Sequence, residues 1–335
     1  MRRPRLKIDP REGAHYYHCM SRTVNSEWLF AEGDREALRK LIWAVSEFCG
    51  LRVVTYAILS NHFHLLVKVP KATFVEDEEV LRRYAVLYPN SATPITGSGD
   101  NMPAASTINP LPSWMDKQRR QMGDLSAFMK ILKQRFTNLF NTRHERHGTL
   151  WSERFKSVLV EGSRALKMIA AYIDLNAVRA GLVQDPKDYR FCGYSEAVAG
   201  NGRARKGLCE VIEEMSWKNA APHYRRLLFG IGSKPSDTKG SISHQALEGM
   251  LRSKGVLPLH VVLRCRVRYL SEGGIVGSRN FVAGELQKLR RKYGRVRGLE
   301  PRTLPPIADW GPITLLRRCQ AGICEPGSEP RRAKP

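Results

Sequence analysis

The stretch SNHFHLLVKV, residues 60–69, places two histidines one residue apart inside an apolar run. Residues i and i+2 of a β-strand project from the same face of a sheet. His62 and His64 are therefore expected to share one face, while Phe63 and Leu65 point to the other. Two histidines in a strand are more often hydrogen-bonded fillers than metal ligands, so the pair indicates a site only with a partner from elsewhere in the chain.

The patterns on either side of this strand predict alternating strands and helices. Residues 51–59 are rich in β-branched side chains and meet 62–69 at a Ser60-Asn61 corner, which predicts a hairpin. Apolar residues at helical spacing between Asp34 and Gly50 predict a helix with Asp34 as its N-cap and Gly50 just beyond its end. The sequence also predicts strands over 15–23 and 156–161 and helices over 125–143 and 164–180.

This order of elements predicts an α+β fold, a ferredoxin-like antiparallel sheet with helices on one face, followed by a C-terminal, mostly helical basic region. The expected domain organisation is a main domain over 10–200 with an insertion at about 70–124, a linker over 201–240, a small helical accessory domain over 241–300, and a basic tail over 301–335. The proline and arginine content of that tail predicts disorder.

The composition of the 335-residue chain indicates a polyanionic partner. The formal net charge is +23 with a sequence pI near 10.0, and nucleic acid is the commonest partner of such a protein, with an anionic membrane surface as the rival. No apolar run is long enough for a membrane span, and the basic start lacks the apolar core of a secretory signal. Seven scattered cysteines without a CxxC pair favour reduced thiols in a cytoplasmic protein.

Tyr172 and Asn176 are four residues apart in the predicted helix over 164–180, so they lie on one helical face. On its own, such a pair is more often a half-buried tyrosine and a solvent-facing asparagine. Together with His62 and His64, however, the amide oxygen of Asn176 would make a third ligand and leave coordination positions open, which is typical of a catalytic metal site. An amide oxygen in the set favours Mg²⁺ or Mn²⁺ over zinc.

Tyr172 would then face a phosphate bound at that metal. A tyrosine hydroxyl is a weak nucleophile at neutral pH, so attack on a phosphodiester requires charge neutralisation and alignment of the reacting atoms, both of which a divalent ion supplies. The expected products are a covalent phosphotyrosine and a free 3′-hydroxyl. Because the covalent link conserves the bond energy, the step is reversible and suits cutting and rejoining DNA.

Three separated motifs carry a family resemblance: SNHFHLLV, the block GTLWSERFKSVLVE over 148–161, and the helix AAYIDLNAVRAGLV. In this order they resemble the single-tyrosine HUH transposases, and most nearly the branch of REP-associated tyrosine transposases. The resemblance covers roughly residues 10–195. It departs from the branch at Ala177, where a proline often follows the asparagine, and in the insertion and the long basic C-terminal part.

The resemblance implies a metal-dependent transposase that cleaves and rejoins single-stranded DNA through a 5′-phosphotyrosine, next to a hairpin-forming REP element and usually as a homodimer. By motif position it implies that His62 and His64 bind the metal, that Asn176 completes its binding, and that Tyr172 is the nucleophile. The departures leave the dimer and the hairpin recognition less supported than the chemistry.

Basic and aromatic residues interleave in the segment over 143–157, a composition typical of single-strand binding. The alternative is that the aromatic side chains anchor a strand within the core. The candidate nucleic-acid contacts are Arg143, Arg146, Trp151, Arg154, Phe155 and Lys156, together with Arg22 and Asn25 in a turn-like stretch after the first strand.

A second basic stretch, 286–302, carries seven basic residues and one acid, which suggests phosphate contacts without base reading. Two further functions stay open. One is a catalytically inactive nucleic-acid-binding regulator on the same fold. The other is an RNA-binding module, against which the missing aromatic RNP-type strand motif argues.

Overall fold

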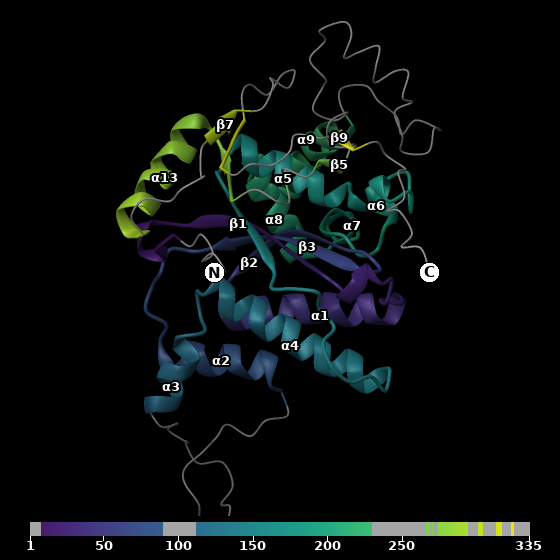
Figure 1. Cartoon of the computed structure of the whole chain (residues 1–335), viewed down its shortest axis with the longest axis vertical. Helices are drawn as coiled ribbons and strands as arrows, with labels where there is room; N and C mark the ends of the chain where they lie inside the picture. Colours follow the sequence, from purple (N-terminus) through teal and green to yellow (C-terminus); the bar gives the residue numbers. More distant parts are fainter. Residues whose placement is uncertain are drawn as a thin grey trace, which may run out of the picture.

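One seven-stranded sheet, in the order β2-β3-β1-β4-β6-β8-β7, organises the protein (Figure 1). This computed structural model describes residues 8–89, 112–229, 266–267, 270, 274–293, 301–303, 313–316 and 323–324. The first four strands are β1 (His15–Arg22), β2 (Arg52–Ile58), β3 (His62–Val69) and β4 (Lys156–Val160). They pair antiparallel in the order β2-β3-β1-β4, which is that of a ferredoxin-like sheet, so the predicted α+β class is confirmed.

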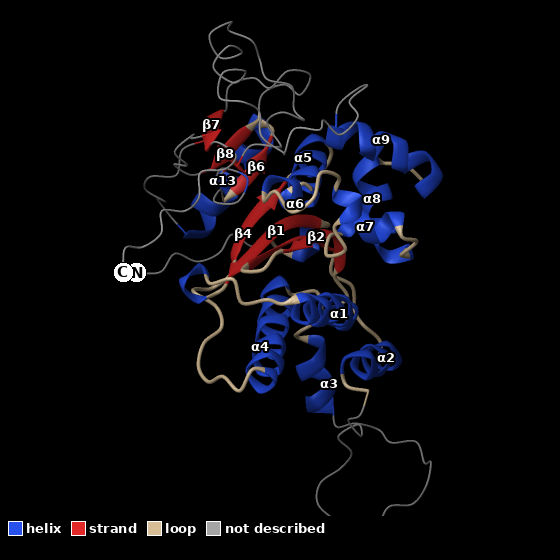
Figure 2. Ribbon diagram, turned by 90° about the vertical axis from the view of Figure 1, so that its right-hand side faces the viewer, coloured by secondary structure: helices blue, strands red, loops and turns tan. Residues whose placement is uncertain are grey.

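Two helices, α1 (Glu32–Cys49) and α4 (Leu125–Arg143), cover the face of the sheet that carries Phe63 and Leu65 (Figure 2). Their buried apolar residues recur at helical spacing: Leu38, Ile42 and Val45 in α1, and Phe128, Leu132 and Phe136 in α4. The helix α1 ends at Gly50 as predicted, in the left-handed conformation with φ 63°. It begins earlier than predicted, and Asp34 accepts a hydrogen bond from the Ala31 N–H at 3.1 Å from inside the first turn.

The opposite face of the sheet is also covered, which corrects the expectation of helices on one face only (Figure 2). The covering helices are α5 (Arg164–Asp174), α6 (Asn176–Arg179), α7 (Gly193–Val198), α8 (Gly202–Ile212) and α9 (Trp217–Phe229). This face carries Leu66, Val158 and Val160, each at most 2% exposed, so it requires a cover against water.

The segment predicted to be a linker over 201–240 instead forms α8 and α9 in its described residues, and 230–240 lie outside the described part. Helix α8 lies directly on β2 at Gly207. A Cβ added at this position would come within 2.2 Å of the carbonyl oxygen of Val54, so the close approach requires glycine.

The C-terminal part extends the main sheet. The strand β6 (Ile275–Gly277) pairs in parallel with β4, β8 (Thr314–Leu316) pairs with β6, and β7 (Pro301–Thr303) pairs with β8. Helix α13 (Arg279–Tyr293) follows β6, and β5 (Arg266–Val267) pairs with β9 (Ile323–Cys324) in a second sheet. The strands β6, β7 and β8, from 241–300 and 301–335, therefore join the main sheet, where the sequence predicted a separate helical domain and a disordered tail. These strands are too short for a period of two to reveal them.

The predicted insertion over 70–124 contains α2 (Asp77–Leu87) and α3 (Pro112–Arg119), and residues 90–111 lie outside the described part. Three short 3₁₀ turns complete the described elements: η1 (Pro10–Glu12), η2 (Val24–Ser26) and η3 (Pro186–Asp188). None of the described helices combines the length and apolarity needed to cross a membrane.

Candidate active site

The two histidines of β3 lie on the same face of the sheet, as the sequence predicted. Their ring centroids are 5.1 Å apart. In the antiparallel pairing with β1, His62 lies opposite Arg22 and His64 opposite Met20, and directly opposed residues share a face. His62 is half-buried, whereas His64 is only 2% exposed. Arg22, a predicted nucleic-acid contact, is thereby placed beside the histidine pair.

A third histidine, His18 of β1, contacts His64 and was not identified from the sequence. His18 Nε2 lies 2.8 Å from His64 Nδ1, and His18 Nδ1 lies 2.8 Å from the carbonyl oxygen of Leu270. A carbonyl only accepts, so His18 Nδ1 carries the proton and, in the neutral ring, His18 Nε2 accepts. His64 Nδ1–H must then be the donor to His18. The Nε2 of neutral His64 is left with a free lone pair.

Burial keeps both of these rings neutral. Burial lowers the pKa of His18 to about 4, and the backbone hydrogen bond to Leu270 only partly opposes this effect. Burial also holds the pKa of His64 well below its usual range, and the neighbouring His18, His62 and Arg179 lower it further. The tautomers inferred from the hydrogen bonds therefore apply at neutral pH.

His62 is held in the same tautomer as His64, with the proton on Nδ1, by a different partner. Its Nδ1 lies 2.6 Å from Asn61 Oδ1, and the Asn61 amide nitrogen donates to the carbonyl oxygen of Ser26 at 3.0 Å, which fixes the amide. His62 Nδ1–H is therefore the donor, and in the neutral ring its Nε2 is the nitrogen that carries a lone pair. A ring N–H held by a second group is the usual support of a histidine that binds a metal through its other nitrogen.

Helix α5 brings Tyr172 to this histidine cluster of His18, His62 and His64. The Tyr172 ring makes edge contacts with His18 and with His64, each at 6.0 Å between centroids, and the residue is 4% exposed. Residues far apart in the sequence, from β1, β3 and α5, thus meet on one side of the sheet (Figure 1).

Arg179, from α6, holds Tyr172 from the other side. Its guanidinium carbon lies 4.0 Å from the centre of the Tyr172 ring, and its Nη2 donates to the Tyr172 carbonyl oxygen at 2.6 Å. A permanent positive charge therefore lies beside the tyrosine ring. The sequence did not predict this role for Arg179.

Asp174 anchors the end of α5 to the rest of the fold. It is fully buried and accepts hydrogen bonds from Thr55 Oγ1 at 2.7 Å, from the Tyr194 N–H at 3.1 Å and from Tyr224 Oη at 2.5 Å. Burial raises the pKa of Asp174 to about 7, although these three hydrogen bonds oppose the rise. The carboxyl ties α5 to β2, α7 and α9, two residues from Tyr172.

Asn176 is 7% exposed at the start of α6, one turn after Tyr172. Its amide nitrogen donates to the carbonyl oxygens of Tyr172 and Ile173, at 3.3 Å and 3.1 Å, so its oxygen is the atom left for a ligand role. Among the described residues there is no cluster of three His, Cys, Asp or Glu side chains suited to a metal. Two imidazole nitrogens and an amide oxygen are nonetheless donor types that suit Mg²⁺ or Mn²⁺, so the chemistry of these three side chains would fit such an ion.

The predicted aromatic contacts to DNA are core residues. Trp151 is 8% exposed, its ring lies 5.4 Å from that of Phe63, and its Nε1 donates to Thr137 Oγ1 at 2.9 Å. Phe155 is 7% exposed. Neither side chain is available to stack on a base, because both fill the interior, so the structure corrects this expectation in favour of the packing alternative.

The remaining predicted contacts lie at the surface or in structural pairs. Arg143 bonds Asp34, a buried carboxylate, at 3.0 Å, and Arg146 lies over the Phe140 ring at 5.7 Å. Arg154 is exposed. Lys156 is exposed and pairs with Glu153 at 3.0 Å. Asn25, with φ 51°, donates to Glu27 at 3.1 Å in an exposed turn.

Trp28 is an exposed aromatic residue that the sequence analysis missed. It is 75% exposed, in a loop that is fastened to the corner before His62. The Thr23 N–H donates to the Asn61 carbonyl at 2.9 Å and the Phe30 N–H to the Ser60 carbonyl at 2.8 Å. A large, exposed indole on a loop that is fastened to the corner before His62 offers the kind of surface on which a base can stack.

Comparison with known proteins shows a distant structural likeness. No protein-family model and no curated protein matches the chain. Among solved structures, the chain is similar to one described as "Structure of the REP associates tyrosine transposase bound to a REP hairpin", with a TM-score of 0.34 and 14% identity over 60% of this chain and 86% of that chain. Similarity of this size does not establish a family or a function, which leaves the geometry of the site as the basis for a functional proposal.

Proposed function

We propose that the protein is a metal-dependent DNA strand transferase that cleaves and rejoins single-stranded DNA through a covalent bond between Tyr172 and a 5′-phosphate. One observation carries the proposal. His64, a neutral buried imidazole with a free Nε2, shares a sheet face with His62, and the Tyr172 ring lies 6.0 Å from the ring of His64.

In this proposal His62 and His64 hold the metal through Nε2, and the Asn176 oxygen completes the set. The expected ion is Mg²⁺ or Mn²⁺, which when bound would neutralise charge on the phosphate oxygens. Asn61 and His18 keep the two rings in the tautomer that exposes Nε2. Because burial keeps the His64 ring neutral, this ring needs no proton loss before binding.

The group transfer uses residues of this chain. The Tyr172 hydroxyl oxygen forms a bond to phosphorus, the bond from phosphorus to the 3′-oxygen breaks, the phenolic proton passes to water, and the leaving oxygen takes up a proton. Arg179, 4.0 Å from the ring centre, supplies a positive charge next to the nucleophile. Trp28 would stack on a base of the bound strand, and Arg22 would contact its backbone.

The substrate we propose is a single strand beside a folded REP-type hairpin, bound by a homodimer in the cytoplasm. This part follows from the resemblance of the three sequence motifs. The net charge of +23 supports a nucleic-acid partner in general.

The test is the formation of a covalent protein–DNA adduct. The full-length protein is incubated with Mn²⁺ and an end-labelled single strand flanked by a hairpin, and adducts are separated under denaturing conditions. Tyr172→Phe keeps the ring that packs on His18, His64 and Arg179, so it should fold and bind DNA but form no adduct. Tyr189→Phe, which removes another buried hydroxyl, should form the adduct normally. An adduct with Tyr172→Phe would rule out this nucleophile.

The alternative is a catalytically inactive nucleic-acid-binding regulator. The 4% exposure of Tyr172 favours it, because a nucleophile must reach its phosphate. A regulator of this kind would bind DNA equally well with and without a chelator and would form no adduct with any strand tested. Its affinity would still fall steeply with salt.

A further inference from the structure

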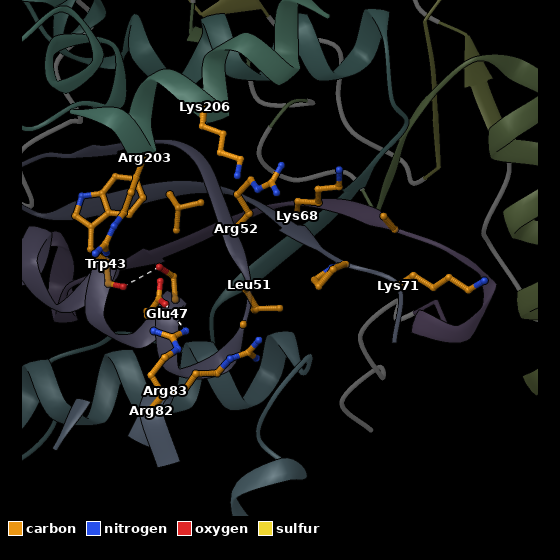
Figure 3. A pocket seen from close by; sticks show the side chains of 15 residues that line it. Trp43, Glu47, Leu51, Arg52, Lys68, Lys71, Arg82, Arg83, Arg203 and Lys206 are labelled. Carbon is orange, nitrogen blue, oxygen red and sulfur yellow. Dashed lines mark hydrogen bonds and ion pairs between the residues drawn. The ribbon is translucent and has the colours of Figure 1, made fainter. Parts of the chain in front are cut away.

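A basic cavity of about 480 Å³ lies at the β2 edge of the sheet (Figure 3). Its walls come from the end of α1, from β2 and β3, from α2 and from the N-terminal half of α8. Seven cationic side chains line it: Arg52, Lys68, Lys71, Arg82, Arg83, Arg203 and Lys206. The cavity is separate from the histidine cluster, since none of the three histidines or Tyr172 lines it.

The acidic residues around this cavity do not neutralise it. Glu210 is shared by Arg52, at 2.6 Å, and Lys68. Glu79 is likewise shared by Arg82 and Arg83, each at 2.6 Å. With Glu47, which bonds Arg82 at 2.7 Å, three carboxylates face seven cations, an excess of four positive charges.

Several of these cations are held in place. The Arg83 guanidinium lies against Gly50, where a Cβ would come within 2.1 Å of Nη1, so a side chain at position 50 would displace it. Fixed guanidinium groups lose little conformational freedom when they bind an oxyanion.

Arg203 and Lys206 contribute charge without an evident structural role. Both are exposed, three residues apart at the start of α8, and neither side chain has an ion-pair partner among the described residues. A cation in the first turn of a helix opposes its dipole, so the position of Arg203, the second residue of α8, is unfavourable for the helix itself. An anion bound between α8 and β2 would offset that cost.

We infer that this basic cavity binds the phosphodiester backbone of DNA at a distance from the reacting phosphate. Lys68 lies four residues after His64 on the same strand and the same face, which places the cavity at roughly 13 Å along β3 from the histidine cluster. A DNA that reaches Tyr172 can therefore reach the cavity with a flanking segment. The choice of DNA as the polyanion rests on the proposed function.

The test measures the salt dependence of binding to a labelled hairpin with a single-stranded flank, by fluorescence anisotropy of the full-length protein. Arg203→Ala/Lys206→Ala should weaken binding and reduce the slope of log K against log salt by ~1.8, from two lost phosphate contacts. Lys71→Ala, at a third exposed position in the cavity, should reduce the slope by ~0.9. Lys130→Ala/Arg226→Ala removes the same charges from exposed positions outside the cavity and should leave the slope unchanged.

The outcomes separate this inference from the proposed function. If both cavity variants have the same slope of log K against log salt as the control pair, the cavity is not a DNA site. This conclusion holds even if the wild type forms adducts. A reduced slope without any wild-type adduct would support the cavity and reject the strand-transfer chemistry. Adduct formation on a short single strand without the hairpin should be the same in the cavity variants and the wild type.

Discussion

His18 Nε2 lies 2.8 Å from His64 Nδ1, and this contact determines which nitrogen His64 presents to the site. Because His18 Nδ1–H is committed to the Leu270 carbonyl, His18 can only accept from His64. The prediction is that His18→Ala lowers Mn²⁺ affinity about 10–100-fold, the usual cost of losing such a support. Isothermal titration calorimetry measures it.

His18→Gln supplies the control for this contact, because its amide oxygen can still accept from His64 and should recover most of the affinity. His223→Ala removes an exposed histidine and should have no effect. Equal Mn²⁺ affinity for His18→Ala and wild type would show that His18 does not orient the ligand.

Trp28→Ala should weaken binding of a single strand by about 1–3 kcal/mol, the usual contribution of one stacked base, with no loss of folding stability. The residue is 75% exposed, so its removal leaves no cavity in the core. Fluorescence anisotropy with a single-stranded probe measures the change. Met215→Ala, at a fully exposed position, is the matched control, and an equally small effect of both substitutions would exclude Trp28 as a stacking surface.

Trp151→Leu should destabilise the protein but leave DNA affinity unchanged, since the indole is buried against Phe63 and bonded to Thr137. Truncation of a buried tryptophan to alanine costs about 3–5 kcal/mol, and leucine, which fills part of the space, should cost less. Urea unfolding and anisotropy on the same sample separate the two effects. A tenfold weaker affinity in the folded variant would restore the base-stacking hypothesis for Trp151.

Asp174→Asn should remove a pH dependence of stability. The pKa of Asp174 is raised from 3.8 to about 7 in the folded protein, so between these values the folded state holds a proton that the unfolded state releases. The free energy of unfolding of the wild type should therefore fall by at most about 4 kcal/mol as the pH rises from about 4 to about 7. Above that pH it should level off.

Urea unfolding at pH 4.5 and at pH 7.5 measures this difference. Asparagine can still accept from Thr55 and donate to Tyr224 Oη, so the variant should fold, and its stability relative to the wild type should improve with rising pH. A constant stability difference between the two proteins at both values would show that Asp174 is ionised throughout.

The sequence by itself determined the strands and helices of the ferredoxin-like core and the shared face of His62 and His64. Both depend on local geometry: a period of two in a strand fixes the side-chain direction whatever the strand pairs with. The helix over 125–143 was likewise predicted with its observed bounds. In the structure its buried apolar residues recur at helical spacing, and Asp124 caps it by accepting from the Ala127 N–H at 2.7 Å.

Only the tertiary structure decided which residues meet. His18 is 46 residues from His64 and contacts it through the register between β1 and β3, which no local pattern encodes. Burial of Trp151, the cover on the second sheet face and the addition of β6, β7 and β8 also depend on contacts between distant segments. The local sequence does not distinguish an aromatic residue that stacks on DNA from one that is buried in the core. Only the packing around the side chain differs between the two cases.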